Sequence, residues 1–252
     1  SISSSPLDAA GGRVLLIHDM TEAYAMQREL QRHQRLSAMG EMAAGLAHQL
    51  RTPLATALLY ASHLKKLDLP ETERVRFADK VLARLRRLEH LIQDMLSFVK
   101  GEGGGQDLVR MSSVLVDLQQ VMEPQMIERG LNFSIQDDGQ GAAVLGSRKA
   151  LTGALLNLLE NAMQACSEGG RVSLKSEIGD DGQVLIVVAD NGKGINVATQ
   201  DRLFEPFYTT RTDGTGLGLA IVRGVAEAHR GSVQVKSAPG CGSEFILRLP
   251  KL

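Results

Sequence analysis

Apolar residues recur every three or four positions through two long stretches of the first hundred residues, as in amphipathic helices. Helix-forming residues dominate from about 22 to 66, and only Gly40, Gly45 and Pro53 interrupt them. The sequence LDLPE then predicts a turn, and a second helix follows over 70–100. The apolar positions that define this second helix are Val81, Leu85, Leu88, Ile92, Met95 and Val99.

Two long amphipathic helices joined by a short turn predict an antiparallel helical hairpin. A single hairpin cannot bury apolar stripes on both of its sides. We therefore expect two copies of the chain to pair into a four-helix bundle, which makes the protein a homodimer.

The pattern changes after the glycine-rich sequence GEGGGQ at 101–106, which predicts a flexible linker. Beyond it, helical and strand patterns are mixed, and four or five strands with three helices predict a layered α/β sandwich. The whole chain is thus expected to be α+β. The expected helices cover 112–129, 147–166 and 217–229, with Ser147 as an N-cap, and the strands cover 131–135, 171–177, 183–190, 232–237 and 243–249.

The N-terminal segment carries one strand signal. The apolar run Val14 to Ile17 is too short for a helix, and the sequence SISSSPLDAAGG before it is small, polar and expected to be mobile. Because a lone terminal strand cannot form a domain, we expect the chain to be the tail of a longer protein.

Composition narrows the function classes. With 252 residues, 43% hydrophobic and 23% charged, the chain can form real cores, and a net charge of −1 favours neither nucleic acid nor a membrane surface. No apolar run approaches the length of a membrane span, and no tryptophan is present for stacking on bases. Cys166 and Cys241 lack metal-ligand spacing, which favours a reducing, cytoplasmic location.

One histidine of the first predicted helix stands out, in the sequence EMAAGLAHQLRTPLA. Leu46 and Leu50 each lie about 200° around the helix from His48, so the imidazole should face water if the leucines face a core. Pro53 removes the N–H that would bond the carbonyl of Gln49, which predicts a bend beside the histidine. Alone, this pattern also fits a surface histidine near an incidental kink.

Two segments of the second half carry polar groups next to apolar runs. LLNLLENAMQA places Asn157 and Asn161 one turn apart on one helical face, and their amide oxygens suit Mg²⁺ shared with phosphates. ADNGKGI follows an apolar strand and places Asp190 before Gly192 and Gly194, which let the backbone approach a ligand. An ordinary Asn-Gly turn explains the second segment equally well.

Two further segments complete the set. RLFEPFYTTRT predicts a small apolar plug in a mobile loop around Phe204 and Phe207. GTGLGLAIV opens a helix with alternating glycines at Gly214, Gly216 and Gly218, and N–H groups of a first helical turn can cradle phosphate oxygens. Each segment alone is weak evidence, because glycine-rich helix starts are common.

The order and spacing of the four segments are distinctive, and they resemble the ATP-binding domain of sensor histidine kinases. That domain belongs to the Bergerat (GHKL) superfamily, which also includes chaperone, mismatch-repair and gyrase ATPases. The hairpin resembles the dimerisation and histidine phosphotransfer domain of the same kinases, whose box reads roughly H-E-x-R-T-P-L against HQLRTPL here. RTPLATALLYASHL and PFYTTRTDGTGLGL are most similar to flagellar-regulatory kinases that partner NtrC-type response regulators.

The resemblance implies a domain order and a set of site residues. The expected domains are the end of a PAS-like sensor domain (1–20), a signalling helix (21–35), the dimerisation and phosphotransfer domain (36–100), a linker (101–109) and the catalytic ATP-binding domain (110–252). The implied cofactor-binding residues are Asn157, Asn161, Asp190, Gly192, Gly194, Arg211, Gly214, Thr215, Gly216, Leu217 and Gly218.

The family's roles transfer to these positions as expectations. Asp190 accepts a hydrogen bond from the adenine amino group of ATP, Asn161 holds Mg²⁺, and Arg211 reaches the β/γ end of the phosphates. The segment 194–214 is the ATP lid. His48 attacks the γ-phosphorus to form a phosphohistidine, from which an aspartate of a response regulator receives the phosphoryl group.

The residue after the phosphoacceptor departs from the family pattern. Most such kinases place Glu or Asp there, whereas this chain has Gln49, whose amide can orient the imidazole but cannot accept its proton. Glu41 is roughly 10 Å away by helical rise, which is too far to substitute. Thr52 lies where the family places a residue that positions water for dephosphorylating the partner, so a phosphatase activity is also expected.

Three other functions compete with this one. A conformational ATPase of the same superfamily needs a glutamate base where this chain has Asn157. A protein-serine kinase of that superfamily leaves the histidine-bearing hairpin unexplained. A non-catalytic scaffold gated by ATP, or a regulator dominated by its phosphatase activity, stays open because of Gln49.

Overall fold

The computed structural model describes residues 43–252 except 67, 101–104, 106, 140, 212 and 213. Before residue 43 it describes the segments 2–6 and 13–17 and isolated positions between 19 and 40. The chain divides into two compact units, Ser1–His48 and Gln49–Leu252.

The first unit contains a strand pair. β1 (Ile2–Pro6) pairs antiparallel with β2 (Arg13–Ile17), with Ile2 opposite Ile17. The predicted strand at 14–17 is confirmed, and Ile2–Pro6, for which no strand was predicted, forms its partner. The backbone N–H and C=O groups of β2 need partners, and a neighbouring segment can supply them whatever its side chains are.

Of the signalling helix expected at 21–35, the structure describes only isolated positions. Those at 22, 26, 29, 30 and 33 are helical, and the rest of that prediction lies outside the described residues.

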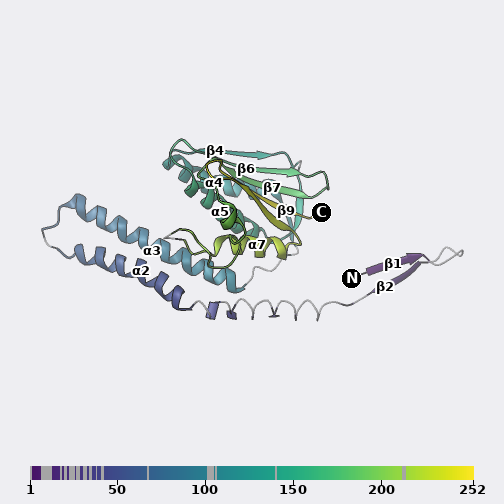
Figure 1. Cartoon of the computed structure of the whole chain (residues 1–252), viewed down its shortest axis with the longest axis horizontal. Helices are drawn as coiled ribbons and strands as arrows, with labels where there is room; N and C mark the ends of the chain where they lie inside the picture. Colours follow the sequence, from purple (N-terminus) through teal and green to yellow (C-terminus); the bar gives the residue numbers. More distant parts are fainter. Residues whose placement is uncertain are drawn as a thin grey trace. The chain divides into compact units, whose positions relative to one another are not determined.

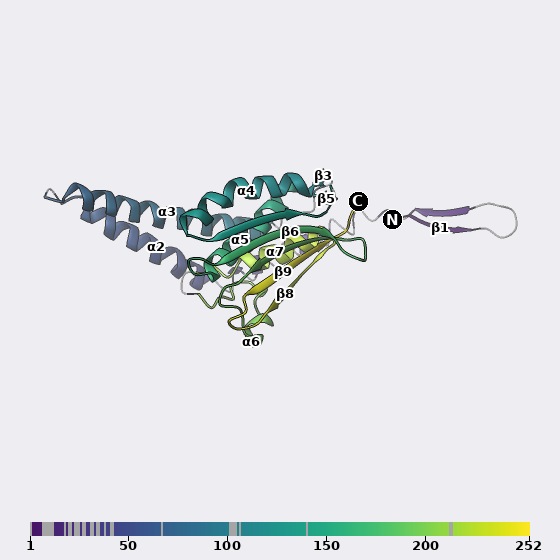
Figure 2. The ribbon, with the colours of Figure 1, turned by 90° about the horizontal axis from the view of Figure 1, so that it is seen from above.

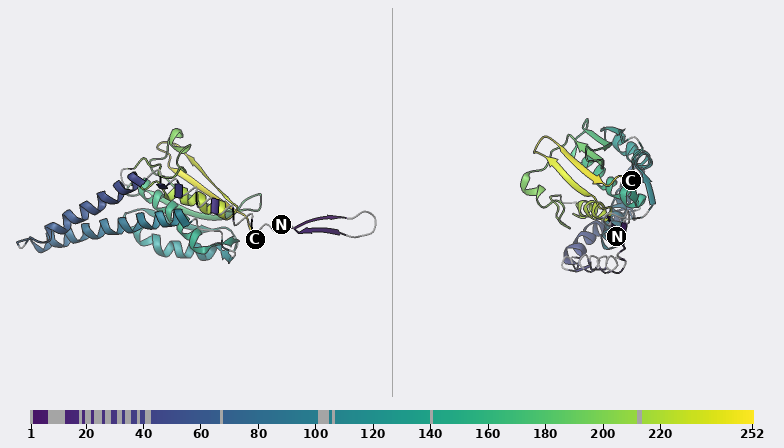
Figure 3. Two further views of the ribbon diagram at one scale, coloured as in Figure 1. Left: turned by 90° about the horizontal axis from the view of Figure 1, so that it is seen from below. Right: turned by 90° about the vertical axis from the view of Figure 1, so that its right-hand side faces the viewer.

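The helical hairpin consists of α2 (Ala43–His63) and α3 (Glu71–Lys100), which lie side by side in Figures 1 and 3. Near the turn the His63 ring stacks on Phe77, with 5.0 Å between ring centroids. Pro53 is buried inside α2. The predicted hairpin is therefore confirmed from residue 43 onward.

One copy of the hairpin leaves a large amount of apolar surface exposed. Such a surface is typical of an interaction site, and it follows both helices at helical spacing. The exposed apolar residues of the hairpin include Leu54, Leu58, Leu59, Val75, Leu82, Leu85, Ile92 and Leu96.

The rest of the second unit is built on a five-stranded mixed sheet, visible in Figures 1 and 2. In spatial order its strands are β4 (Asn132–Asp137), β6 (Arg171–Ile178), β7 (Val184–Asp190), β9 (Ser243–Leu249) and β8 (Ser232–Ser237). Only β4 and β6 run parallel. Alternate residues such as Val184, Ile186 and Val188 are buried, as expected for a sheet covered on one face.

Three helices pack against the sheet and supply the other half of the core. They are α4 (Met111–Glu128), α5 (Arg148–Ala165) and α7 (Gly218–Ala228), and α5 contacts both α4 and α7. The N-cap prediction for α5 is confirmed, since Ser147 Oγ accepts the N–H of Ala150 at 3.2 Å. The largest fully buried side chains include Leu118, Met122, Leu155, Leu158, Leu174, Ile186 and Leu247.

Three short elements were not predicted. β3 (Asp107–Arg110) pairs with β5 (Ala143–Gly146) in a separate two-stranded sheet, so a strand already begins within the segment expected to be linker, 101–109. α6 (Val197–Gln200) lies in the expected ATP lid. Four-residue elements carry too little hydrophobic periodicity to be recognised from sequence.

Buried His229 connects the C-terminal end of α7 to the start of α5 by two hydrogen bonds. Its Nε2 accepts the N–H of Ser147 at 3.0 Å, so Nδ1 carries the proton and donates to the Val225 carbonyl at 2.7 Å. This side chain fixes the relative position of α5 and α7, the two helices that carry the candidate site.

Candidate active site

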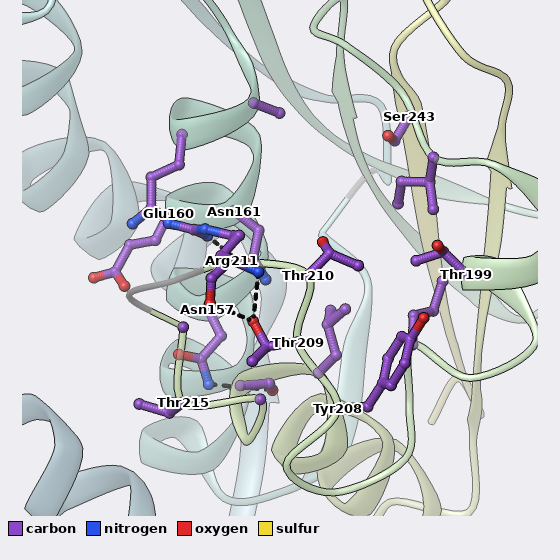
Figure 4. Close-up of a pocket in the computed structure, with 18 of the residues that line it drawn as sticks. Asn157, Glu160, Asn161, Thr199, Tyr208, Thr209, Thr210, Arg211, Thr215 and Ser243 are labelled. Carbon is purple, nitrogen blue, oxygen red and sulfur yellow. Dashed lines mark hydrogen bonds between the residues drawn. The ribbon is translucent and has the colours of Figure 1, made fainter. Parts of the chain in front are cut away.

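A cavity of about 500 Å³ is lined by residues from five segments of the chain, 87–94, 157–165, 190–203, 208–219 and 243–245 (Figure 4). Its volume is typical of a small-molecule site. Of the eleven predicted cofactor-binding residues, only Gly192 and Leu217 do not line it. Those that line it are Asn157, Asn161, Asp190, Gly194, Arg211, Gly214, Thr215, Gly216 and Gly218.

Asp190 stands at the end of β7, where its carboxylate reaches the cavity. Its Oδ1 accepts the N–H of Gly192 at 2.8 Å. Burial raises the pKa of Asp190, while hydrogen bonds from Gly192 and Ser243 oppose this. Gly192 therefore belongs to the site as a support for the carboxylate, although it does not line the cavity.

Ser243 is a site residue that sequence analysis missed. It lines the cavity, and the β7–β9 register places it directly opposite Asp190. A serine at the start of a strand carries no chemical signal of its own. Only the strand pairing, which joins residues 53 positions apart, brings Ser243 to the carboxylate.

Asn157 and Asn161 both line the cavity from α5, as their spacing predicted. Asn157 Nδ2 donates to the Gly218 carbonyl at 3.4 Å. Asn161 Oδ1 accepts a hydrogen bond from Arg211 Nη1 at 3.3 Å, and Figure 4 shows the two side chains together. The oxygen expected to ligate Mg²⁺ thus faces a cation in this structure.

The glycine turn before α7 has a backbone that requires glycine. Gly216 has φ +69°, and a Cβ there would collide with the backbone of Phe207, whose N–H bonds the Gly216 carbonyl at 2.8 Å. The side chain of Leu217 is fully buried and anchors the turn in the core. Its N–H donates to Thr215 Oγ1 at 3.1 Å, so the turn is ordered by its own side chain.

Helix α3 forms one side of the cavity, which sequence analysis did not predict. Arg87, His90, Leu91 and Asp94 all line the cavity. They lie on one helical face by their spacing, but a charged helix face ordinarily indicates solvent. Asp94 Oδ2 accepts a hydrogen bond from Thr215 Oγ1 at 3.1 Å.

Helix α3 also contacts the segment 194–214, the expected lid, at Phe207. The Phe98 ring packs edge-on against Phe207, with 5.9 Å between centroids. Phe207 belongs to the predicted apolar plug, which in this structure therefore contacts the hairpin.

The three predicted hairpin residues differ in environment. His48 is exposed on α2, as predicted, and Leu46 is buried. Thr52 is exposed. Gln49 is half-buried, its Nε2 donates to the Gly214 carbonyl at 3.4 Å, and no described residue donates to its buried Oε1. The bend expected beside His48 stays a prediction.

Asn161 is the residue of the cavity that was predicted to ligate a magnesium ion. Among the described residues, no group of three or more His, Cys, Asp or Glu side chains forms a metal cage. Asn161 offers one neutral oxygen, which suits an ion that keeps several ligands from water and phosphate.

Two family models match the chain. The model described as "His Kinase A (phospho-acceptor) domain" matches residues 38–104, and the model described as "Histidine kinase-, DNA gyrase B-, and HSP90-like ATPase" matches residues 146–252. The first contains His48 and the second contains all the predicted cofactor-binding residues. The chain therefore belongs to the histidine kinases, with a phospho-acceptor domain followed by an ATPase domain.

Similar proteins agree with this assignment. Sensor protein kinase FleS of Pseudomonas aeruginosa is 44% identical over 250 residues, and histidine-protein kinase AtoS of Escherichia coli is 30% identical over 239 residues. They match 99% and 95% of this chain, which spans 61% and 39% of their own lengths. The crystal structure of histidine kinase ThkA in complex with the response regulator protein TrrA matches with a TM-score of 0.75 and 27% identity. That match covers all of this chain and 75% of the other.

None of the helices in the described part of the chain is long and apolar enough to cross a membrane.

Proposed function

We propose that this chain is the kinase core of a two-component sensor, which phosphorylates His48 from ATP and passes the phosphoryl group to a response-regulator aspartate. The observation that carries the proposal is the convergence of nine predicted nucleotide residues on one cavity, in a chain whose phospho-acceptor domain exposes His48. The activity of the whole protein belongs to this proposal, because the chain spans only part of its relatives.

Asp190 selects the base in this proposal. Its ionised carboxylate accepts a hydrogen bond from the amino group of adenine, whereas guanine presents an oxygen there and is repelled. Gly192 and Ser243 hold the carboxylate in place and favour its ionised form. Gly194, with φ +67°, packs its backbone against Ala238 and keeps the base side of the cavity free of a side chain.

The glycine turn and the asparagines serve the phosphates. Backbone N–H groups of 214–218 and the N-terminus of α7 bind phosphate oxygens, and Arg211 neutralises the β/γ end. Asn161 would hold Mg²⁺ together with the phosphates, and Asn157 fixes the turn through Gly218. The bound ion supplies charge neutralisation of the transferred phosphoryl group.

The transfer itself uses the imidazole of His48. One ring nitrogen forms a bond to the γ-phosphorus while the bond from phosphorus to the leaving oxygen of ADP breaks. The proton on the other ring nitrogen needs an acceptor for the neutral phosphoimidazole to form. Gln49 cannot accept it, so we infer that water takes this proton and that the reaction is slow for its class.

Several finer features also belong to the proposal. The kinase forms a homodimer through the exposed apolar surface of α2 and α3. Its partner is a response regulator of the NtrC type in flagellar gene control, as the resemblance of RTPLATALLYASHL and PFYTTRTDGTGLGL to flagellar-regulatory kinases implies. Thr52, exposed one turn after Gln49, positions water for dephosphorylating that partner.

The upstream segment completes the proposed organisation. The β1–β2 pair is the end of a PAS-like sensor domain (1–20), a signalling helix (21–35) connects it to the phosphotransfer domain (36–100), and a linker (101–109) leads to the catalytic domain (110–252). The location is cytoplasmic, where ATP and a response regulator are available.

Incubation with γ-labelled ATP and Mg²⁺ tests the proposal. We expect the chain to acquire a label that is labile in acid and stable in base, as the phosphorus–nitrogen bond of phosphohistidine requires. Measurable ATP binding without any label would instead favour the non-catalytic scaffold. A label stable in acid would point to a hydroxyl acceptor and exclude the histidine kinase.

Replacing Gln49 by glutamate is expected to raise the autophosphorylation rate by about tenfold or more, which is a modest part of the roughly 10²–10⁴-fold that general-base catalysis typically contributes. Glutamate can accept the imidazole proton, and it also loses the hydrogen bond that Gln49 Nε2 donates to Gly214. Single-turnover labelling at saturating ATP measures the chemical step. Gln49→Ala is the matched control, because it loses the same hydrogen bond without adding a base; equal rates in the two variants would contradict the prediction.

A further inference from the structure

A carboxylate of the hairpin is bound at the glycine turn before α7. Thr215 Oγ1 donates to Asp94 Oδ2 at 3.1 Å, and the same hydroxyl oxygen accepts the N–H of Leu217 at 3.1 Å. Helix α7 begins at the next residue, Gly218. The unpaired N–H groups and dipole of a helix N-terminus favour a negative charge there.

The surroundings of Asp94 disfavour the ionised form of its carboxylate. Burial raises the pKa of Asp94, and the nearby carboxylate of Glu160 adds to this, while the Thr215 hydrogen bond and His90 oppose it. Both Asp94 and Glu160 line the cavity with Asn161. The same end of the cavity would have to admit a triphosphate, whose charge has the same sign.

The groups that hold Asp94 are those that hold phosphate. Hydroxyl donors and backbone N–H groups at a helix N-terminus bind carboxylate and phosphate oxygens alike. Two anions cannot share these donors, because like charges a few ångströms apart repel strongly in a partly buried site. Asp94 and a nucleotide phosphate therefore exclude each other at Thr215.

We propose that Asp94 is a specificity-determining residue of the ATP site, whose carboxylate competes with a nucleotide phosphate for the Thr215 hydroxyl and the adjoining helix start. This inference rests on the proposed function, since it assumes that the cavity binds ATP. The hairpin thereby lowers the affinity for nucleotides that carry phosphates and leaves the recognition of the base unchanged. ATP binding then requires that Asp94 release Thr215.

A purely supportive role for Asp94 predicts the opposite sign. If the carboxylate only kept the turn in shape, its removal would weaken ATP binding. Asp94→Asn separates the two roles, because an amide oxygen can still accept the Thr215 hydrogen bond but carries no charge. Asp94→Ala removes both the charge and the acceptor.

The experiment compares the dissociation constants of ATP and of adenosine by calorimetric titration of the whole chain with Mg²⁺. We expect Asp94→Asn and Asp94→Ala to bind ATP about fivefold more tightly, a typical strength of coupling between sites, and adenosine as before. Glu89→Gln is the matched control, since it removes one charge from an exposed position of the same helix outside the cavity. Thermal unfolding of each variant establishes that it is folded.

Two results would overturn the inference in distinguishable ways. Unchanged or weaker ATP binding by Asp94→Asn, with adenosine still bound, overturns the competition and leaves the proposed function intact. Failure of the wild-type chain to bind either ligand overturns both. An equal gain in ATP affinity from Glu89→Gln would reduce the effect to net charge and also contradict the specific role of Asp94.

Discussion

His48→Ala is expected to abolish the acid-labile label from γ-labelled ATP while the affinity for ATP stays unchanged. The side chain is exposed, so its removal changes the free energy of unfolding by less than about 0.5 kcal/mol. The neighbouring polar groups Gln49 and Thr52 are an amide and a hydroxyl, which are intrinsically weaker nucleophiles than an imidazole at neutral pH. Quantitative labelling beside calorimetric ATP titration measures both parts of this expectation.

The matched control is His33→Ala, which removes another histidine from an exposed helical position. It should label as the wild-type chain does. Label retained by His48→Ala would place the phosphoacceptor elsewhere and contradict the assignment of the HQLRTPL segment. Loss of label in both variants would indicate a general effect on the helix.

Asp190→Asn is expected to weaken ATP binding by about 10- to 100-fold, the range for losing a hydrogen bond to a charged group. The amide presents a neutral oxygen or an N–H donor, and a donor would face the amino group of adenine unfavourably. The preference for ATP over GTP should fall by a similar factor. Competition titrations with both nucleotides measure the change.

The pH dependence of binding tests the charge of Asp190 directly. Because burial raises the pKa of Asp190, protonation begins at a higher pH than for an ordinary aspartate. Lowering the pH through this pKa removes the ionised acceptor, so ATP affinity should fall, and Asp190→Asn should lack this component. The exposed Asp180→Asn is the matched control. An identical pH profile in wild type and Asp190→Asn would exclude the proposed contact.

The site residues and strands that the sequence did not predict depend on contacts between positions far apart in the chain. Nothing in the sequence distinguishes Arg87, His90 and Asp94 from a solvated helix face, because helical periodicity separates apolar from polar faces but cannot indicate which polar face lines a site. Ser243 reached the site only through the register of β7 and β9. The small sheet of β3 and β5 likewise joins segments about 36 residues apart, and neither strand has enough residues to be recognised alone.

Local chemistry was sufficient for much of the rest. The hairpin, the α/β layers and the Ser147 cap followed from periodicity and turn residues, since each depends on neighbours within one or two turns of chain. The nine cavity-lining residues followed from the resemblance that the four short segments carry. Tertiary structure alone decided that Gln49 bonds Gly214, that Asp94 bonds Thr215 and that Phe98 packs on Phe207. These contacts join residues more than one hundred positions apart, where only the packing of α2 and α3 against the ATP-binding domain brings the partners within reach.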